Sequence, residues 1–230
     1  MCESWGDNVV MARLPHGYTN RTRVVGSFVE KVYDGPDRYA HAQAERVCLS
    51  ALAECLPVPM IVGGDSEGPS LLLDVLPGSH GQDLLATGHA EEVLRLVGAT
   101  LRSVQAVCVD DVLGLAGDGS MLVHGDFGPQ NMLFDLERDR VTGILDWEFA
   151  HRGQAIEDLA WCEWIVRMHH PDANDALDAL FGAYGERPPW RERHEAMLIR
   201  IRDLIASCER ARQPSDWPER LLRTERWSAE

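Results

Sequence analysis

Lysine is nearly absent from this chain of 230 residues. Lys31 is the only one, and all other basic side chains except histidine are arginines. Cysteine is also sparse, and its six occurrences include no C-x-x-C pair and no spacing typical of a metal finger. This scarcity argues against a disulfide framework and a zinc site, and it predicts reduced thiols in a cytoplasmic protein.

Long apolar runs are missing as well. No run approaches the length of a membrane span, and the first residues, Met1-Cys2-Glu3-Ser4-Trp5, have neither the basic region nor the apolar core of a signal peptide. We therefore expect a cytoplasmic protein that has no membrane partner.

Positive charge is in deficit. The net charge is −15, and residues 80–165 carry five basic and fifteen acidic side chains. A field of this sign argues against nucleic acid or an anionic membrane as partner, and it favours a cationic small molecule. The alternative is an acidic surface that serves only solubility.

The chain length suits one large domain or two small lobes. Strand-like patterns and one helical pattern at 36–56 come first, up to a Pro77-Gly78 break. Helical patterns at 91–107, 155–168, 173–184, 190–211 and 216–227 dominate the rest. The order predicts an α+β protein with a first lobe at 1–76, built on a small antiparallel sheet, and a mainly helical second lobe at 77–230.

The most informative stretch follows the short apolar run 121–123. It contains Asp126, Asn131 five residues later and Asp146 twenty residues later, each placed near the end of an expected strand. One carboxylate so placed can accept a proton from a hydroxyl, while an amide oxygen and a second carboxylate hold Mg²⁺ on a nucleotide's phosphates. The alternative is an ordinary hairpin with aspartates in its turns.

This stretch carries a family resemblance. His124-Gly125-Asp126 with Asn131, followed by Ile144-Leu145-Asp146-Trp147-Glu148, resembles the phosphotransferase family of aminoglycoside and choline kinases. The resemblance implies a two-lobed protein-kinase-like fold, ATP and Mg²⁺ as cofactors, Asp126 as catalytic base, and Asn131 and Asp146 as metal ligands. It also implies that His124 supports the catalytic loop, and that Asp158 braces this loop from behind.

Lys31 alternates with Val29 and Tyr33 on an expected strand, where a kinase lobe needs an ammonium on the nucleotide's phosphates. Glu45 falls on the apolar stripe of the following helix, so a buried carboxylate there requires a counter-ion. We expect Lys31 to be that counter-ion. The alternatives are an exposed lysine and a glutamate at the edge of the stripe, in water.

The resemblance places the remaining nucleotide contacts on two segments. Gly17, Thr19 and Asn20 belong to a turn-rich stretch similar to the family's nucleotide loop, although Tyr18 stands where a second glycine is usual. The backbone at 73–76, which includes Asp74 and Leu76, corresponds to the hinge that meets adenine. Plain turn and core-strand roles are the alternatives.

The acceptor is predicted least well, because the C-terminal helices that build its pocket are shorter than in many relatives. Glu148 and Glu157 follow the metal-binding Asp146 closely and are candidates for contacts to a cationic acceptor. One departure concerns Gly153-Gln154-Ala155, which replaces the family's common Gly-Asp-Pro and leaves the cap of the next helix in question.

We therefore expect an ATP-dependent enzyme that phosphorylates a hydroxyl of a small cationic compound, with an aminoglycoside or related antibiotic as first candidate. A metabolic kinase of choline-like alcohols is the second hypothesis. The third is a nucleotide-binding regulatory module without catalysis, which the presence of Lys31, Asp126, Asn131 and Asp146 disfavours. The sequence makes no prediction of oligomeric state.

Overall fold

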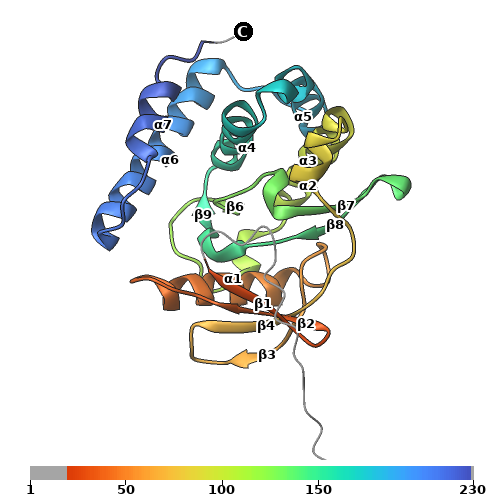
Figure 1. The fold of residues 1–230 in the computed structure, drawn as a ribbon, viewed down its shortest axis with the longest axis vertical. Coiled ribbons are helices and arrows are strands. Elements are labelled where there is room, and N and C mark those ends of the chain that lie inside the picture. Colours follow the sequence, from red (N-terminus) through yellow and green to blue (C-terminus); the bar gives the residue numbers. More distant parts are fainter. Residues whose placement is uncertain (1–19, 229–230) are drawn as a thin grey trace, which may run out of the picture.

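The computed structural model describes residues 20–228. At one end lies a four-stranded antiparallel sheet with the strand order β1-β2-β4-β3 (Figure 1). Its strands are β1 (Arg21–Val25), β2 (Phe28–Val32), β3 (Ile61–Asp65) and β4 (Ser70–Asp74). The tight turn between β1 and β2 uses Gly26 with a positive φ of 61°, a conformation that favours glycine.

Helix α1 (Arg38–Leu52) lies between this sheet and the rest of the molecule (Figure 1). Its buried residues recur at intervals of three and four, which places them on one face of the helix; they are Ala42, Glu45, Cys48, Leu49 and Leu52. The sequence pattern predicted a longer helix, but the last turn before Pro57 does not form. A residue before proline disfavours helical geometry, and proline offers no N–H to continue the helix.

After β4 the chain leaves the first sheet. The short β5 (Ser79–His80) pairs with β7 (Met132–Asp135), which forms a hairpin with β8 (Arg140–Ile144). A separate ladder joins β6 (Met121–Val123) to β9 (His151–Gly153). These short pairs lie next to α1 on the side away from the first sheet, and they carry the polar motif of the sequence.

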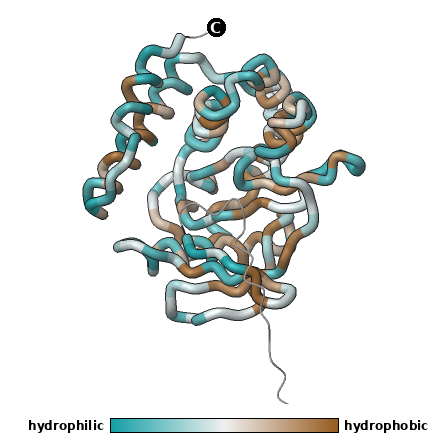
Figure 2. The backbone as a smooth tube through the Cα atoms, viewed as in Figure 1, coloured by the Kyte–Doolittle hydropathy of each residue, from teal (hydrophilic) through white to brown (hydrophobic). Residues whose placement is uncertain are grey.

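Helices make up most of the second lobe. They are α2 (Gly81–Ala86), α3 (Ala90–Gln105), α4 (Ala155–His169), α5 (Leu177–Tyr184), α6 (Trp190–Ala211) and α7 (Trp217–Thr224). The helical pattern expected at 91–107 corresponds to α3, whose apolar stripe is buried throughout; its members are Val93, Leu94, Val97, Leu101 and Val104. Helices α6 and α7 mix hydrophobic and hydrophilic residues along their length (Figure 2), as expected of helices with one buried face.

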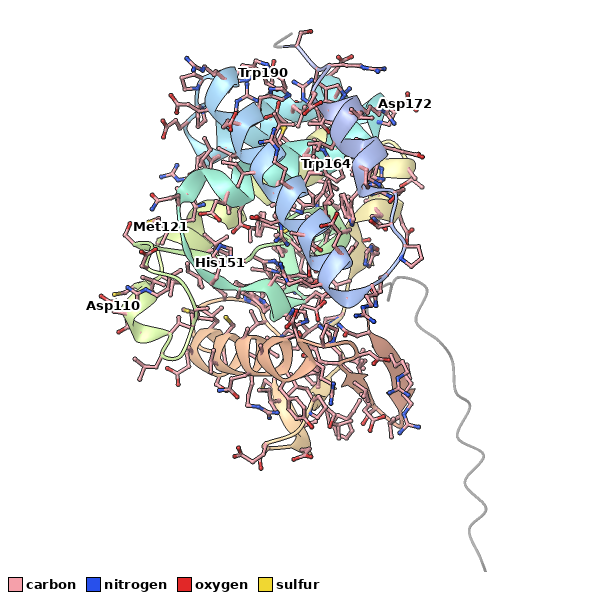
Figure 3. The ribbon with its side chains drawn as sticks, turned by 90° about the vertical axis from the view of Figure 1, so that its left-hand side faces the viewer. Asp110, Met121, His151, Trp164, Asp172 and Trp190 are labelled. Carbon is pink, nitrogen blue, oxygen red and sulfur yellow. The ribbon has the colours of Figure 1, made fainter. Side chains whose placement is uncertain are left out.

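A second hydrophobic cluster joins α4 to α6 and α7. Trp161 and Trp164 stack with ring centres 4.4 Å apart, and Trp217 of α7 packs against both. Figure 3 shows Trp164 inside this helical layer. The spacing of Trp161, Trp164 and Met168 at i, i+3 and i+7 predicts core packing, and the structure confirms it for all three.

The five cysteines at described positions are free thiols. Between residues 20 and 228, no helix combines the length and the hydrophobicity that crossing a membrane requires.

Candidate active site

The loop after β6 is fixed by its backbone. Gly125 has a φ of 83°, and a β-carbon at this position would lie 2.4 Å from the carbonyl oxygen of Phe149. Only glycine fits this close approach without a shift of the backbone. The loop then enters a short 3-10 turn, Pro129–Asn131, which leads directly into β7. Asp126 and Asn131 thus begin and end one rigid segment.

Asp158 of α4 holds this loop from behind. Its two carboxylate oxygens accept hydrogen bonds from the backbone N–H groups of His124 and Gly125, at 2.7 and 2.9 Å. Burial raises the pKa of the Asp158 carboxyl to about 6, although the two N–H donors lower it in part. The contacts agree with the support expected of Asp158.

His124 ties the same loop to the segment that carries Asp146. Its Nε2 lies 2.9 Å from the carbonyl oxygen of Leu145, and its Nδ1 accepts a hydrogen bond from the backbone N–H of Asp126 at 3.2 Å. Because the imidazole is buried, its pKa is lowered to about 4. The ring is therefore neutral near pH 7, which suits a positioning residue.

We expect Asp158→Asn to destabilise the protein by roughly 1–3 kcal/mol, because the amide supplies one acceptor oxygen for two buried N–H donors. Urea unfolding followed by tryptophan fluorescence measures this loss. The exposed Asp203→Asn on α6 is the control for an equal change of charge. Equal unfolding midpoints for the two variants would show that Asp158 does not stabilise the catalytic loop.

Both carboxylate oxygens of Asp126 have partners. The indole N–H of Trp161 donates to Oδ1 at 2.8 Å, and the side-chain amide of Asn131 donates to Oδ2 at 2.8 Å. Burial raises the pKa of Asp126, and the hydrogen bond from Trp161 counteracts this rise. Trp161 therefore fixes the direction of the carboxylate and favours its ionised form.

The spacing of Trp161 with Trp164 and Met168 predicts core packing alone and gives no sign of the bond to Asp126. The available signal was its position three residues after Asp158, since residues at this spacing share one face of a helix. That spacing places Trp161 on the side of α4 that meets the catalytic loop.

Trp161→Phe is expected to lower kcat by roughly ten-fold. This factor corresponds to the free energy of one hydrogen bond to a charged group. The loss of the donor raises the pKa of Asp126, so the acid limb of the pH profile of kcat should move to higher pH. Trp164→Phe is the matched control, because it removes an indole N–H bonded to Thr224 rather than to Asp126. An unchanged pH profile in Trp161→Phe would contradict this role.

Asp146 follows β8 in a left-handed conformation, with φ 68° and ψ 55°. Aspartate tolerates this region better than most residues. The side-chain nitrogen of Asn131 donates hydrogen bonds to Asp126. The side-chain oxygen of Asn131 has no hydrogen bond to a described residue. One carboxylate and one amide oxygen fit Mg²⁺, which takes few protein ligands when phosphates and water complete its octahedron.

Lys31 lies on β2 of the four-stranded sheet, at the point where this sheet approaches Asp146. Its ammonium contacts the carboxylates of Glu45 and Asp146, and the hydroxyl of Tyr33 also donates to Glu45. Burial lowers the pKa of Lys31, but the carboxylates of Asp146, Glu45 and Glu148 raise it more, so the net shift is upward. The structure therefore brings Lys31 and Glu45 together as the sequence predicted.

Glu148 does not lie on an open acceptor surface. It is 2% exposed, and one of its oxygens accepts a hydrogen bond from Asn20 at 2.7 Å. Burial, followed by the charge of Asp146, raises the pKa of Glu148 to about 7. This burial leaves the Glu148 carboxylate no open surface for contact with a cationic acceptor.

Glu157 is engaged within its own helix. It completes a capping box with Gln154, and its second oxygen lies 2.9 Å from Nε2 of His151. Gln154 thus caps α4 despite the missing Gly-Asp-Pro. Figure 3 shows His151 low in the helical lobe, on the side of α1. Both Glu157 oxygens are therefore already engaged by groups of the protein, the backbone N–H of Gln154 and the imidazole of His151.

A cavity of about 610 Å³ lies between the two lobes. Lys31, Asn131 and Asp146 line it together with apolar side chains, which are Val29, Leu73, Leu76, Leu133 and Leu145. The cavity also reaches Asn20 and Asp74, whose carboxylate accepts a hydrogen bond from the backbone N–H of Met60 at 2.6 Å. Gly17 and Thr19 of the expected nucleotide loop lie outside the described residues.

Comparison with known families confirms the resemblance seen in the motif. The model of the phosphotransferase enzyme family, APH, matches residues 108–199. The match contains Asp126, Asn131 and Asp146, and it ends within α6.

Two curated relatives match shorter stretches. A probable acyl-CoA dehydrogenase of Arabidopsis thaliana is 47% identical over 45 residues, and the clavilactone A biosynthesis cluster protein Y of Ampulloclitocybe clavipes is 27% identical over 85 residues. These stretches are 20% and 36% of this chain, but only 6% and 21% of the relatives.

Solved structures match nearly the whole chain. The GDP and kanamycin complex of APH(2")-IIia has a TM-score of 0.71 at 16% identity, with 94% of this chain and 92% of that chain covered. The macrolide 2'-phosphotransferase MphH of Brachybacterium faecium has a TM-score of 0.65 at 18% identity, covering 97% and 95%. A choline/ethanolamine kinase family protein of Mesorhizobium loti has a TM-score of 0.61 at 15% identity, covering 94% and 86%. The expected two-lobed kinase-like fold is confirmed.

Proposed function

We propose that this protein transfers the γ-phosphoryl group of ATP to a hydroxyl of a small molecule. The observation that supports this most is the meeting of Lys31, Asn131 and Asp146 at one cavity, with the Asp126 carboxylate hydrogen-bonded to Asn131. These groups come from both lobes and from distant parts of the sequence. A protein that only bound a nucleotide would not need Asp126 held in a fixed direction.

Asp126 orients the acceptor hydroxyl and takes its proton. Lys31, kept charged and in place by Glu45, provides a positive charge for the phosphate oxygens. Asn131 and Asp146 would hold Mg²⁺, which, when bound, neutralises charge on the transferring phosphoryl group. Positioning by these residues is the main contribution to rate, as phosphoryl transfer requires little covalent chemistry from a protein.

The structural neighbours suggest two acceptor classes for this chain. Kanamycin and a macrolide represent antibiotics, while choline and ethanolamine represent metabolic amino alcohols. Both classes carry a hydroxyl within a small molecule, and both agree with a cytoplasmic enzyme that uses neither nucleic acid nor membrane. Antibiotics are the first candidates and amino alcohols the second.

The net negative charge of residues 80–165 favours a cationic acceptor when the sequence is considered alone. The structure weakens this argument, because acidic side chains of the segment are paired with arginines at the surface. Asp110 pairs with Arg152 at 2.7 Å and Asp135 pairs with Arg138 at 2.8 Å, both as exposed ion pairs. Asp110 lies at the outer edge of the molecule (Figure 3). Charges paired and solvated in this way are screened and exert little pull at Asp126.

The function is tested by a thermal-shift titration with Mg-ATP and by a parallel assay of ATP consumption with a panel of hydroxylated compounds. We expect a metal-dependent rise in melting temperature, and ATP consumption that requires an acceptor. Stabilisation by Mg-ATP without consumption on any acceptor would favour the regulatory module instead.

A further inference from the structure

An arginine packs against Trp161, the residue that holds the Asp126 carboxylate, and it does not line the nucleotide cavity. Arg200 belongs to α6, which runs from Trp190 at the far end of the helical lobe toward α1 (Figure 3). Its guanidinium carbon lies 5.3 Å from the ring centre of Phe149 and 5.7 Å from that of Trp161. None of these three residues lines the nucleotide cavity.

The guanidinium of Arg200 is half-buried, yet it makes no hydrogen bond or ion pair with any residue between 20 and 228. Its Nε is buried without a partner. A buried N–H group without a partner costs free energy. The guanidinium of arginine presents five N–H donors in a rigid plane, and this geometry matches the oxygens of a carboxylate or a phosphate. Burial lowers the pKa of Arg200, while the charges of four carboxylates act in the opposite direction; these are Asp126, Asp158, Asp203 and Glu157.

From this juxtaposition of Arg200, Phe149, Trp161 and Asp126 we infer that the acceptor carries an acidic group, a carboxylate or a phosphate, close to the hydroxyl that is phosphorylated. The inference rests on the proposed phosphotransfer, but it replaces the cationic antibiotics and amino alcohols named above with an acidic acceptor. Arg200 binds the acidic group, and the aromatic rings of Phe149 and Trp161 fix the plane of the guanidinium. The polycationic acceptor expected from the net charge is thereby replaced.

A matched set of acceptors tests the inference on the full chain. 4-Hydroxybutyrate, 1,4-butanediol and 4-amino-1-butanol share a four-carbon skeleton and differ only in an end group that is anionic, neutral or cationic. We expect the highest kcat/KM for 4-hydroxybutyrate, or for 4-hydroxybutyl phosphate if Arg200 reads a phosphate. Kanamycin represents the polycationic class.

Arg200→Gln should lower kcat/KM for the acidic acceptor by about 10- to 100-fold, a factor that corresponds to the free energy of a hydrogen bond between charged groups. Most of this loss should be a rise in KM, because Arg200 binds the acceptor. The KM for ATP should not change. Arg202→Gln is the matched control, because Arg202 lies two residues away on the same helix, is exposed, and only approaches Glu195 and Glu225 at 4.0 and 3.9 Å.

Three outcomes would overturn the inference. A higher kcat/KM for 4-amino-1-butanol or kanamycin than for the acidic acceptors would do so, as would equal rates for the whole set. An equal loss with every acceptor in Arg200→Gln would show that Arg200 only balances the charges of Asp126 and Asp158. In all three cases the proposed phosphotransfer stands. A fourth outcome, the absence of any acceptor-dependent ATP consumption, would overturn both the inference and the proposed function.

Discussion

Asp126→Asn is expected to lower turnover by at least about 100-fold, the lower range for loss of a general base. An amide cannot accept the proton of the acceptor hydroxyl. It also offers one acceptor oxygen to two donors, the indole N–H of Trp161 and the amide of Asn131. Mg-ATP binding should remain nearly intact, because Asp126 does not line the nucleotide cavity.

Single-turnover transfer and the Kd for Mg-ATP together check this prediction. Asp175→Asn makes the same chemical change at an exposed position of the 3-10 segment Pro171–Ala176 and should behave as wild type. Near wild-type phosphate transfer by Asp126→Asn would show that Asp126 is a structural residue of the loop and not the base.

Asp146→Ala should abolish Mg²⁺-dependent nucleotide binding. Asn131 alone is a poor ligand set for Mg²⁺, since a carboxylate supplies most of the charge that holds a hard cation. The variant also removes one of the two carboxylates that contact Lys31. Isothermal titration with ATP in the presence of Mg²⁺ and in the presence of EDTA separates the metal contribution from that of the ammonium.

The chain offers a close control for this variant. Asp139, at the turn of the β7–β8 hairpin, has the same left-handed backbone, with φ 51° and ψ 49°. Its side chain is exposed and pairs with Arg95. Asp139→Ala therefore carries the same backbone cost without the proposed metal contact. If both variants bind Mg-ATP as tightly as the parent, Asp146 is an ordinary hairpin residue.

Several helices of the second lobe could be predicted well from periodicity, because helices such as α3 bury one continuous apolar stripe. Helix α4, by contrast, is buried on nearly all sides. The expected range of α6 coincides with the observed Trp190–Ala211. The prediction was less accurate for residues 173–184, where α5 begins only at Leu177 after a 3-10 segment, Pro171–Ala176. Apolar spacing does not distinguish these two kinds of turn when the same residues are buried in both. The β6–β9 pairing was not predicted, because strands of three residues have too little pattern.

The positions of Asp126, Asn131 and Asp146 could be predicted because each lies within a few residues of an apolar run that forms a strand. The pairing of Lys31 with Glu45 was also predictable, because a carboxylate on an apolar stripe requires a partner. Contacts made by packing between distant segments could not be predicted. The burial of Glu148 against Asn20 joins residues separated by 128 positions, and the approach of Arg200 to Phe149 depends on how α6 crosses the lobe.

The roles assigned to Lys31, Asp126, Asn131 and Asp146 share one claim, that a phosphoryl group leaves ATP for an acceptor hydroxyl at this site. The most direct measurement uses ATP labelled in its γ-phosphate, Mg²⁺ and the acceptor panel, with mass spectrometry to identify the product. The account predicts a phosphate monoester on the acceptor hydroxyl, formed by the wild type and nearly absent with Asp126→Asn. Label found only in inorganic phosphate, or a monoester formed equally by both proteins, would contradict it.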